Sequence, residues 1–498
     1  MSQQLLRPPP PRRRKLWLAV AGVVGLIGAV GAAALLSNIA ERKGQAVQTH
    51  YRVVELDDTM DDPAIWGKNY PQHYEDYMKT SEMVPTKHGG SYAVPREPTA
   101  EDPRTFTSQS KIEKEPRMAK MWAGYPFSAD FREERGHRYN FDDQRFTKRQ
   151  TEFKQPGTCL NCHASNYVQM MKEGDGDLRA GFAKLNAMSW DDAAAKIEHP
   201  VACIDCHDPK DMKLRITRPG LMDGLAALKA SQGVENYDVN RDATRQEMRT
   251  LVCAQCHVEY YFKGDEKKLV FPWANGLQAD KIYDFYTEVG FTDWTHKLTG
   301  TKNLKAQHPE YETYQQGIHA RSGVTCADCH MPFKREGSQK ISDHHVRSPL
   351  LNVNKSCQSC HKWPEAEIIA RVEGIQDRHL QMVDRAFTAL MALIDDLEAV
   401  QKAEGETERV KQAREFHRKA SWYVDFVEAE NSTGFHAPQE SARLLSMSID
   451  YSRQGQLALT GGTLRSEKEI KLEEMRNPRV KPVKTTAAPT PPAAAVVQ

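Results

Sequence analysis

The stretch Cys159-Leu-Asn-Cys162-His163 places two cysteines about one helical turn apart and follows them at once with a histidine. The same pattern occurs five times and uses all ten cysteines of the 498-residue chain. The other copies are Cys203-Ile-Asp-Cys206-His207, Cys253-Ala-Gln-Cys256-His257, Cys326-Ala-Asp-Cys329-His330 and Cys357-Gln-Ser-Cys360-His361. Irregular intervals separate the copies, so they are a repeated ligation motif and the chain is not a fixed-period solenoid.

Each copy is the attachment sequence of a c-type haem. The two thiols reach the two vinyl groups of one porphyrin, and the imidazole that follows them becomes the proximal ligand of the iron. Zinc knuckles, redox-active cysteine pairs and a disulfide framework are the alternatives, and five of five pairs followed by histidine argue against them. The sequence therefore predicts five covalently bound haems c, with proximal ligands His163, His207, His257, His330 and His361.

The remaining histidines leave the sixth coordination positions open. The chain has 18 histidines, so thirteen remain after the proximal ligands are assigned. Thirteen imidazoles are enough to close every iron. Composition alone therefore does not distinguish an electron carrier, in which every iron is six-coordinate, from an enzyme with one iron open to a substrate.

Charge and hydropathy indicate the compartment. The 68 basic and 67 acidic residues nearly cancel, which gives no case for nucleic acid binding. Arg12, Arg13, Arg14 and Lys15 precede a charge-free apolar run over residues 16–36, which is long enough to cross a bilayer and starts on the cytoplasmic side. We expect an exported, periplasmic protein. The apolar run is either a cleaved signal peptide or, as its length favours, a retained membrane anchor.

The end of the chain predicts long helices. Ile368, Val372, Ile375, Val383, Phe387, Leu390, Ile394 and Leu397 recur at three- and four-residue steps, which indicates an amphipathic helix that extends to about Val400. A second helix is expected from Glu408 to Ala429, and a third from Pro438 to about Leu459. Together with the polar region before Gln155, which reads as short helices joined by ordered loops, the sequence predicts a mainly α fold with little β structure and with haems forming the core.

Further stretches near the motifs are specific enough to suggest a family. They are Arg135-Gly136-His137, Val258-Glu-Tyr-Tyr-Phe262, Lys305-Ala-Gln-His-Pro-Glu310, Gly317-Ile-His-Ala-Arg321, Met331-Pro332, Ser342-Asp-His344 and Gly434-Phe-His-Ala-Pro438. With the five motifs, they resemble pentahaem cytochrome c nitrite reductase, the ammonia-forming enzyme, from about residue 60 to residue 460. The resemblance implies a periplasmic enzyme that reduces nitrite to ammonium with six electrons.

The resemblance also implies roles for the histidines outside the motifs. The implied distal and proximal pairs are His137 with His257, His319 with His361, His344 with His207, and His436 with His330. Iron closed by two imidazoles moves electrons and excludes substrate. The haem on Cys159 and Cys162 is then the open one.

Three residues match the family's distal pocket at that haem, namely Arg149, Tyr260 and His308. A guanidinium attracts and orients an anion such as nitrite, and imidazole and phenol deliver protons. Each residue also has a simpler interpretation: Arg149 as part of a solvated basic run, Tyr260 as a core aromatic, and His308 as a loop residue before proline.

A calcium ion near the open haem is also implied. Glu259, Tyr260, Lys305 and Gln307 match its ligands, and all of them offer the oxygen donors that a hard cation requires. One departure concerns the open haem itself, because the better-known members have lysine where this chain, like a minority of members, has His163. An imidazole in place of an amine should alter the potential of the iron.

The expected organisation follows from these assignments. Residues 1–37 form the signal or anchor, 38–365 the pentahaem catalytic domain, 366–475 a long-helix region for dimerisation, and 476–498 a disordered tail. The resemblance implies a homodimer that receives electrons from a membrane-bound multihaem quinol dehydrogenase. Two alternatives stay open: a pentahaem electron carrier without a substrate site, and an enzyme of the same architecture that prefers hydroxylamine or sulfite.

Overall fold

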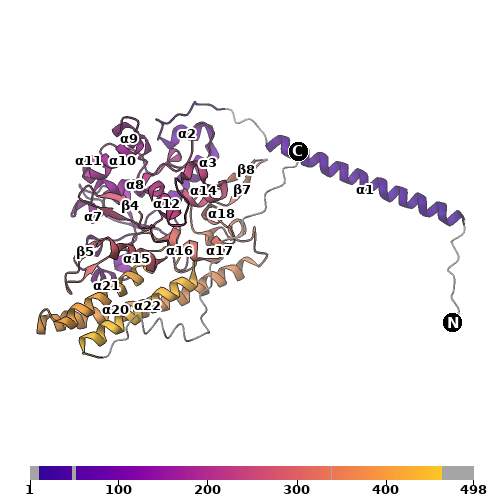
Figure 1. Cartoon of the computed structure of the whole chain (residues 1–498). Helices are drawn as coiled ribbons and strands as arrows, with labels where there is room; N and C mark the ends of the chain where they lie inside the picture. Colours follow the sequence, from indigo (N-terminus) through magenta and orange to yellow (C-terminus); the bar gives the residue numbers. More distant parts are fainter. Residues whose placement is uncertain (1–10, 47–51, 338, 463–498) are drawn as a thin grey trace, which may run out of the picture.

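A computed structural model describes residues 11–46, 52–337 and 339–462 of the chain (Figure 1). The described part is mainly helical, with a few short strands and three long helices near its end. This confirms the predicted fold class. The tail expected over 476–498 lies outside the described residues.

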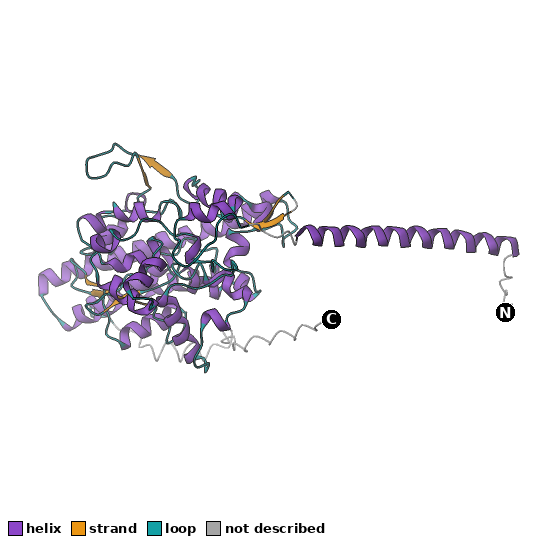
Figure 2. Ribbon diagram, turned by 90° about the horizontal axis from the view of Figure 1, so that it is seen from above, coloured by secondary structure: helices purple, strands orange, loops and turns teal. Residues whose placement is uncertain are grey.

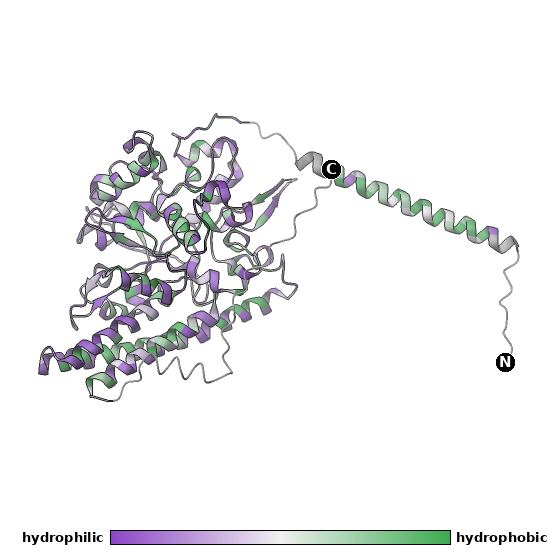
Figure 3. Ribbon diagram, viewed as in Figure 1, coloured by the Kyte–Doolittle hydropathy of each residue, from purple (hydrophilic) through white to green (hydrophobic). Residues whose placement is uncertain are grey.

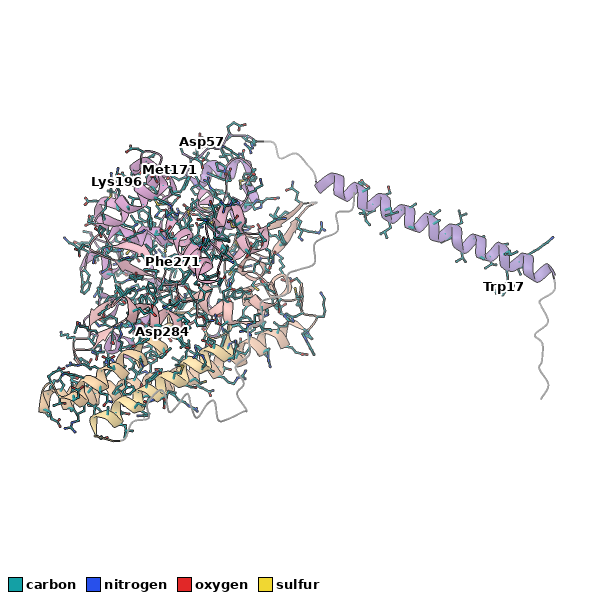
Figure 4. All side chains as sticks on the ribbon, viewed as in Figure 1. Trp17, Asp57, Met171, Lys196, Phe271 and Asp284 are labelled. Carbon is teal, nitrogen blue, oxygen red and sulfur yellow. The ribbon has the colours of Figure 1, made fainter. Side chains whose placement is uncertain are left out.

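The N-terminal helix α1, Pro11–Ala46, stands apart from the rest of the chain (Figure 2). Its segment Lys15–Glu41 is long and apolar enough to cross a membrane, and none of it is buried against the protein. Figure 3 shows its predominantly hydrophobic colouring, and Figure 4 labels the exposed Trp17 near the end of this helix that lies far from the body. A helix of this kind agrees with the predicted signal sequence or anchor.

Short helices and turns make up the region that contains the five motifs. In chain order they are α2 Pro63–Asn69, α3 Pro71–Met78, α4 Lys111–Lys114, α5 Arg117–Met121, α6 Asn140–Arg145, α7 Lys148–Thr151, α8 Leu160–His163, α9 Tyr167–Glu173, α10 Leu178–Ala187, α11 Trp190–Ala194, α12 Pro219–Ser231, α13 Val239–Asp242, α14 Arg245–Leu251, α15 Ala279–Glu288, α16 Glu310–Gln316, α17 Ile318–Arg321, α18 Cys326–His330 and α19 Val353–Ser356. In the described residues between 52 and 155, short helices alternate with loops, as the sequence predicted.

The β structure consists of four antiparallel two-stranded hairpins in the described residues. They pair β1 Ala93–Pro95 with β2 Phe106–Ser108, β3 Tyr261–Lys263 with β4 Lys268–Val270, β5 Trp294–Thr295 with β6 Lys302–Asn303, and β7 Phe333–Glu336 with β8 Gln339–Ser342. The hairpin β3–β4 starts directly after Tyr260, and so it fixes the position of one candidate site residue.

The three long helices are α20 Glu365–Glu404, α21 Glu408–Glu428 and α22 Pro438–Leu459, which confirms the three predicted helices to within a few residues at each end. Their ends follow local signals. Gly405 takes a positive φ of 73° at the end of α20, and the side chain of Thr407 accepts a hydrogen bond from the amide of Val410 at the start of α21. The helices lie side by side along one edge of the body (Figure 1).

The apolar face of α20 is used within the chain. Val383, Phe387, Leu390 and Ile394 are buried in one cluster with residues of α21 and α22, and Leu397 is buried in a neighbouring cluster. These apolar side chains of α20 are therefore already packed within one chain. A homodimer formed through the long helices would use the faces of the helices that point away from this cluster.

Candidate haem-binding and active site

A cavity of about 2530 Å³ lies in the region that contains the motifs. Its lining includes all ten cysteines, the five motif histidines and the four histidines expected as distal ligands. All ten cysteines are free thiols, so none is used in a disulfide. A cavity whose walls carry paired thiols and imidazoles fits covalently attached haem groups.

The motifs fold as single helical turns. In the second, third and fifth motifs, the histidine amide donates to the carbonyl of the first cysteine at 2.9–3.0 Å, as for His207 and Cys203. The fourth motif forms α18, which the capping box of Thr325 and Asp328 starts. A turn of this kind brings both thiols and the imidazole to one side of the backbone, as haem attachment requires.

Polar contacts hold neighbouring motifs together. The buried Arg218 guanidinium donates to the carbonyls of Asn161 and Ala164 at 2.8 and 3.0 Å and to the Asp205 carboxylate at 2.9 Å, and so it joins the first motif to the second. Gln255 donates to the carbonyl of Asp205 at 3.2 Å, which joins the third motif to the second.

The later motifs are joined in the same way. Arg249, just before the third motif, pairs with Asp328 of the fourth at 2.7 Å, and the hydroxyl of Ser356, just before the fifth, donates to the carbonyl of Cys329 at 2.8 Å. All five motifs therefore belong to one connected unit, which suits transfer of electrons between closely spaced haems.

The expected histidine pairs face each other across the cavity. The ring centres of His207 and His344 are 6.2 Å apart, those of His319 and His361 are 6.2 Å apart, and those of His330 and His436 are 6.4 Å apart. A bond from a metal to an imidazole nitrogen is about 2.0 Å, so two rings on opposite sides of one metal have centres about 6 Å apart. These three pairs are spaced to hold one iron each.

His137 and His257 are the fourth expected pair. Burial, with a smaller contribution from the charge of His257, lowers the pKa of His137 to about 4. Both rings line the cavity.

Backbone carbonyls orient several of these rings. The Nδ1 atoms of His207, His330 and His344 lie 2.9–3.0 Å from the carbonyl oxygens of Met212, Arg347 and Ser342, respectively. A proton on Nδ1 that is donated to a carbonyl leaves the lone pair of Nε2 for a metal. The sequence analysis did not identify these acceptors, because backbone carbonyls carry no residue signature.

At three other histidines, a carboxyl group instead of a backbone carbonyl lies near Nδ1. Nδ1 of His436 lies 2.6 Å from Glu430, Nδ1 of His257 lies 3.8 Å from Glu310, and Nδ1 of His163 lies 3.6 Å from Glu134. The sequence analysis assigned no role to these glutamates. Glu310 belongs to one of the stretches that resemble the family, and Glu134 directly precedes another. This resemblance was the only sequence signal for a role of these two residues.

The three predicted distal-pocket residues gather around the first motif. Burial and the nearby charge of Arg149, with a contribution from the neighbouring His308, together lower the pKa of His163 to about 3. Burial also raises the pKa of Tyr260 well above its usual range, and among the charges that act on Tyr260 are Cys162, Cys159 and Arg149. The three side chains and the first motif therefore share one part of the cavity.

Arg149 comes from the short helix α7 and is buried, with only 9% of its surface exposed. Its Nη2 donates to the amide oxygen of Gln144 at 3.2 Å, and the guanidinium lies over the ring of Phe127 at 4.4 Å. Its Nε is buried and has no hydrogen-bond partner among the described residues. A buried guanidinium with a free donor, in a cavity, is suited to bind an anion.

His308 and Tyr260 are set to exchange protons with such an anion. Burial lowers the pKa of His308 to about 4, so its imidazole is neutral at pH 7. The raised pKa of Tyr260 keeps its phenol protonated and able to donate.

The residues expected to bind calcium also lie together. Glu259 is fully buried, and its carboxylate accepts from the Tyr286 hydroxyl at 2.7 Å and from the amide of Gln307 at 2.6 Å. The side-chain amide of Gln307 donates from Nε2 to the carbonyl oxygen of Lys305 at 3.3 Å. The carboxylate of Glu259 and the carbonyl of Lys305 are therefore both linked to Gln307.

Buried carboxyl groups near Glu259 create a negative potential that would favour binding of a cation. Burial raises the pKa of Glu259 well above its usual range, and the carboxylates of Glu312 and Asp293 raise it further. Burial also raises the pKa of Glu312 to about 8 and that of Asp293 to about 7. Among the described residues, no group of three His, Cys, Asp or Glu side chains is arranged around one metal position, so a cation here would depend on carbonyl and amide oxygens.

Two relatives are similar in sequence to most of this chain. Cytochrome c-552 from Bacteroides fragilis is 35% identical over 451 residues, which cover 89% of this chain and 84% of that protein. Cytochrome c-552 from Parabacteroides distasonis is 37% identical over 397 residues, which cover 78% of this chain and 74% of that protein.

A solved structure resembles the whole fold. The catalytic subunit of cytochrome c nitrite reductase from Desulfovibrio desulfuricans, which has two calcium sites, superposes with a TM-score of 0.71 at 30% identity, over 82% of this chain and 88% of that one. The model of the cytochrome c552 family matches residues 62–488. By its five motifs, its fold and this match, the chain belongs to the cytochrome c552 family.

Proposed function

We propose that this protein is a periplasmic nitrite reductase that converts nitrite to ammonium with six electrons. The observation that carries the proposal is the position of Arg149, Tyr260 and His308 around the Cys159–His163 motif, in a chain whose fold matches a nitrite reductase. Three other motif histidines have the ring of a second histidine 6.2–6.4 Å away, whereas the neighbours of His163 include the guanidinium of Arg149 and the imidazole of His308.

Five haems c would be held by the ten motif cysteines. Four would be closed by the pairs His137–His257, His319–His361, His344–His207 and His436–His330, and the fifth would have His163 as its only protein ligand. When bound, the haems supply electrons and one iron with a free coordination position.

The side chains around the fifth haem would bind and protonate the substrate. The buried charge of Arg149 attracts nitrite and orients its oxygens. Tyr260 donates a hydrogen bond from its phenol, and the neutral imidazole of His308 relays protons to the oxygens that leave as water.

Calcium would bind to Glu259, to the carbonyl oxygens of Tyr260 and Lys305, and to the side chain of Gln307. Its charge would offset the buried carboxylates and fix the backbone on both sides of the pocket, because Tyr260 and His308 directly follow two of these ligands in the chain. It would also add positive potential to a site for an anion.

The setting in the cell follows from α1. We propose that this segment carries the protein across the membrane and remains as an anchor, next to a membrane-bound multihaem quinol dehydrogenase that supplies electrons. We also propose a homodimer through the outward faces of α20 and α22.

The experiment is an anaerobic assay of the haem-loaded protein with a reduced viologen donor and nitrite. Oxidised donor and ammonium are both quantified, and the proposal predicts close to six electrons for each ammonium. Parallel assays with hydroxylamine and sulfite identify the preferred substrate. A protein that consumes no nitrite, and whose reduced form binds no added ligand, would instead be an electron carrier.

A further inference from the structure

Nδ1 of His163 lies near a carboxyl group, as does Nδ1 of the proximal histidine His257. The proximal histidines His207 and His330 turn Nδ1 toward backbone carbonyls at 2.9 and 3.0 Å, which are neutral acceptors. Nδ1 of His163 lies 3.6 Å from Oε1 of Glu134, a carboxylate. The ring at the candidate open site therefore has an ionisable acceptor where two of the electron-transfer sites have a peptide group.

Each group of this pair has one buried atom without a hydrogen-bond partner. Nδ1 of His163 and Oε2 of Glu134 are buried atoms without a hydrogen-bond partner in the described part of the chain. A buried polar group left unpaired costs about 1–3 kcal/mol. A movement that shortens the distance from 3.6 Å to the usual length of a charge-assisted hydrogen bond, about 2.8 Å, satisfies the imidazole nitrogen.

The residues beside Glu134 are already paired elsewhere. Arg135 donates to the carboxylate of Asp143 at 2.7–3.0 Å, and Glu133 lies 3.5 Å from the ammonium group of Lys111. Glu134 has 36% of its side-chain surface exposed, and that side chain lines the same cavity as His163. Burial raises the pKa of Glu134 to about 8 and Arg149 and Arg135 act against that rise, but among the described residues His163 is the only basic partner within 4.0 Å of its carboxyl group.

We propose that Glu134 accepts a hydrogen bond from Nδ1 of His163 and is a positioning residue for the open haem. This role rests on the proposed function, because it concerns the iron at which the substrate would bind. A carboxylate that attracts the Nδ1 proton gives the imidazole anionic character, fixes its orientation and strengthens its donation through Nε2. A stronger donor stabilises ferric iron and lowers the potential of that haem.

The test compares Glu134→Gln with Glu133→Gln in the haem-loaded protein. Both variants remove one carboxylate from adjacent positions without changing the shape of the side chain, and only the first removes the acceptor at His163. Resonance Raman spectroscopy of the reduced protein measures the stretching frequency of the iron–histidine bond, and a spectroelectrochemical titration measures the potential of each haem.

We expect Glu134→Gln to lower the stretching frequency and to raise the potential of the five-coordinate haem, while the potentials of the six-coordinate haems stay unchanged. Glu133→Gln should match the wild type in both measurements. A normal iron–histidine band that Glu134→Gln leaves unchanged would overturn the role of Glu134 alone. A wild-type protein without any five-coordinate band would overturn the proposed function and this role together.

Discussion

Arg149 has the clearest single role among the side chains of the pocket, because its charge is buried and one of its donors is free. Replacing Arg149 with glutamine should remove a charge-assisted hydrogen bond to nitrite, worth about 1.5–3 kcal/mol, and lower kcat/KM for nitrite about 10- to 100-fold. Steady-state rates with a reduced viologen donor measure the loss.

Arg145 supplies the matched control for that change. It is exposed on α6, and its guanidinium lies over Phe141 at 4.6 Å. Arg145→Gln should leave kcat/KM unchanged. Equal rates for the two variants and the wild type would show that Arg149 does not contact the substrate.

A buried histidine pair makes the stability of the fold depend on pH. His296 and His417 have ring centres 5.0 Å apart, and the hydroxyl of Thr299 lies 3.0 and 3.2 Å from their Nδ1 atoms. Burial lowers the pKa of both, and the positive charge of His296 lowers that of His417 further, to well below 6.5.

This pair should therefore destabilise the protein in acid. Below pH 6.5 the unfolded chain binds protons that the folded chain excludes, so stability falls by up to about 1.4 kcal/mol per pH unit for each such histidine. His417→Gln should reduce the loss of thermal stability between pH 7.5 and pH 5.5. A variant whose melting temperature falls with pH as steeply as that of the wild type would refute this.

At the scale of elements, a close backbone contact holds two ligand segments together. A Cβ atom built on Gly317 would lie 2.0 Å from the carbonyl oxygen of His436, so only glycine fits at that position. Gly317 immediately precedes α17, which carries His319, and the loop before α22 carries His436. This contact sets the relative position of two candidate iron ligands.

Gly317→Ala should push these segments apart. We expect a loss of about 1–3 kcal/mol in stability and a weaker low-spin signal from the two haems that His319 and His436 would close. The control is Gly374→Ala within α20, where a Cβ atom would meet only the end of Arg378 at 3.8 Å. Melting curves and absorption spectra measure both effects, and equal spectra for the two variants would contradict the argument.

Local signals made the elements predictable. Three- and four-residue spacing gave the three long helices, and the CxxCH pattern gave the position of each motif turn. The hairpin β3–β4 and the pairing of His163 with Glu134 were not predictable, since neither leaves a periodic pattern. The buried bridge from Arg218 to Asn161 joins residues 57 apart in sequence, and only the folded chain shows it.

At the scale of the whole molecule, the five motifs, the paired histidines and the pocket residues line one continuous cavity. Under the proposed function, this arrangement would place the electron-transfer groups and the substrate pocket within one folded unit. The expected pairs could be named from the family resemblance but not from the residues alone, because thirteen histidines were available for the sixth positions. The folded chain brings three of the four pairs to the spacing of a shared iron.

The central claim is that one iron of five is open and the other four are closed by paired histidines. The most direct measurement is electron paramagnetic resonance of the purified ferric protein, with and without nitrite, on a sample whose mass shows full haem loading. The account predicts four low-spin haems and one high-spin haem, with only the high-spin signal changed by nitrite. Five low-spin haems that ignore nitrite would contradict it.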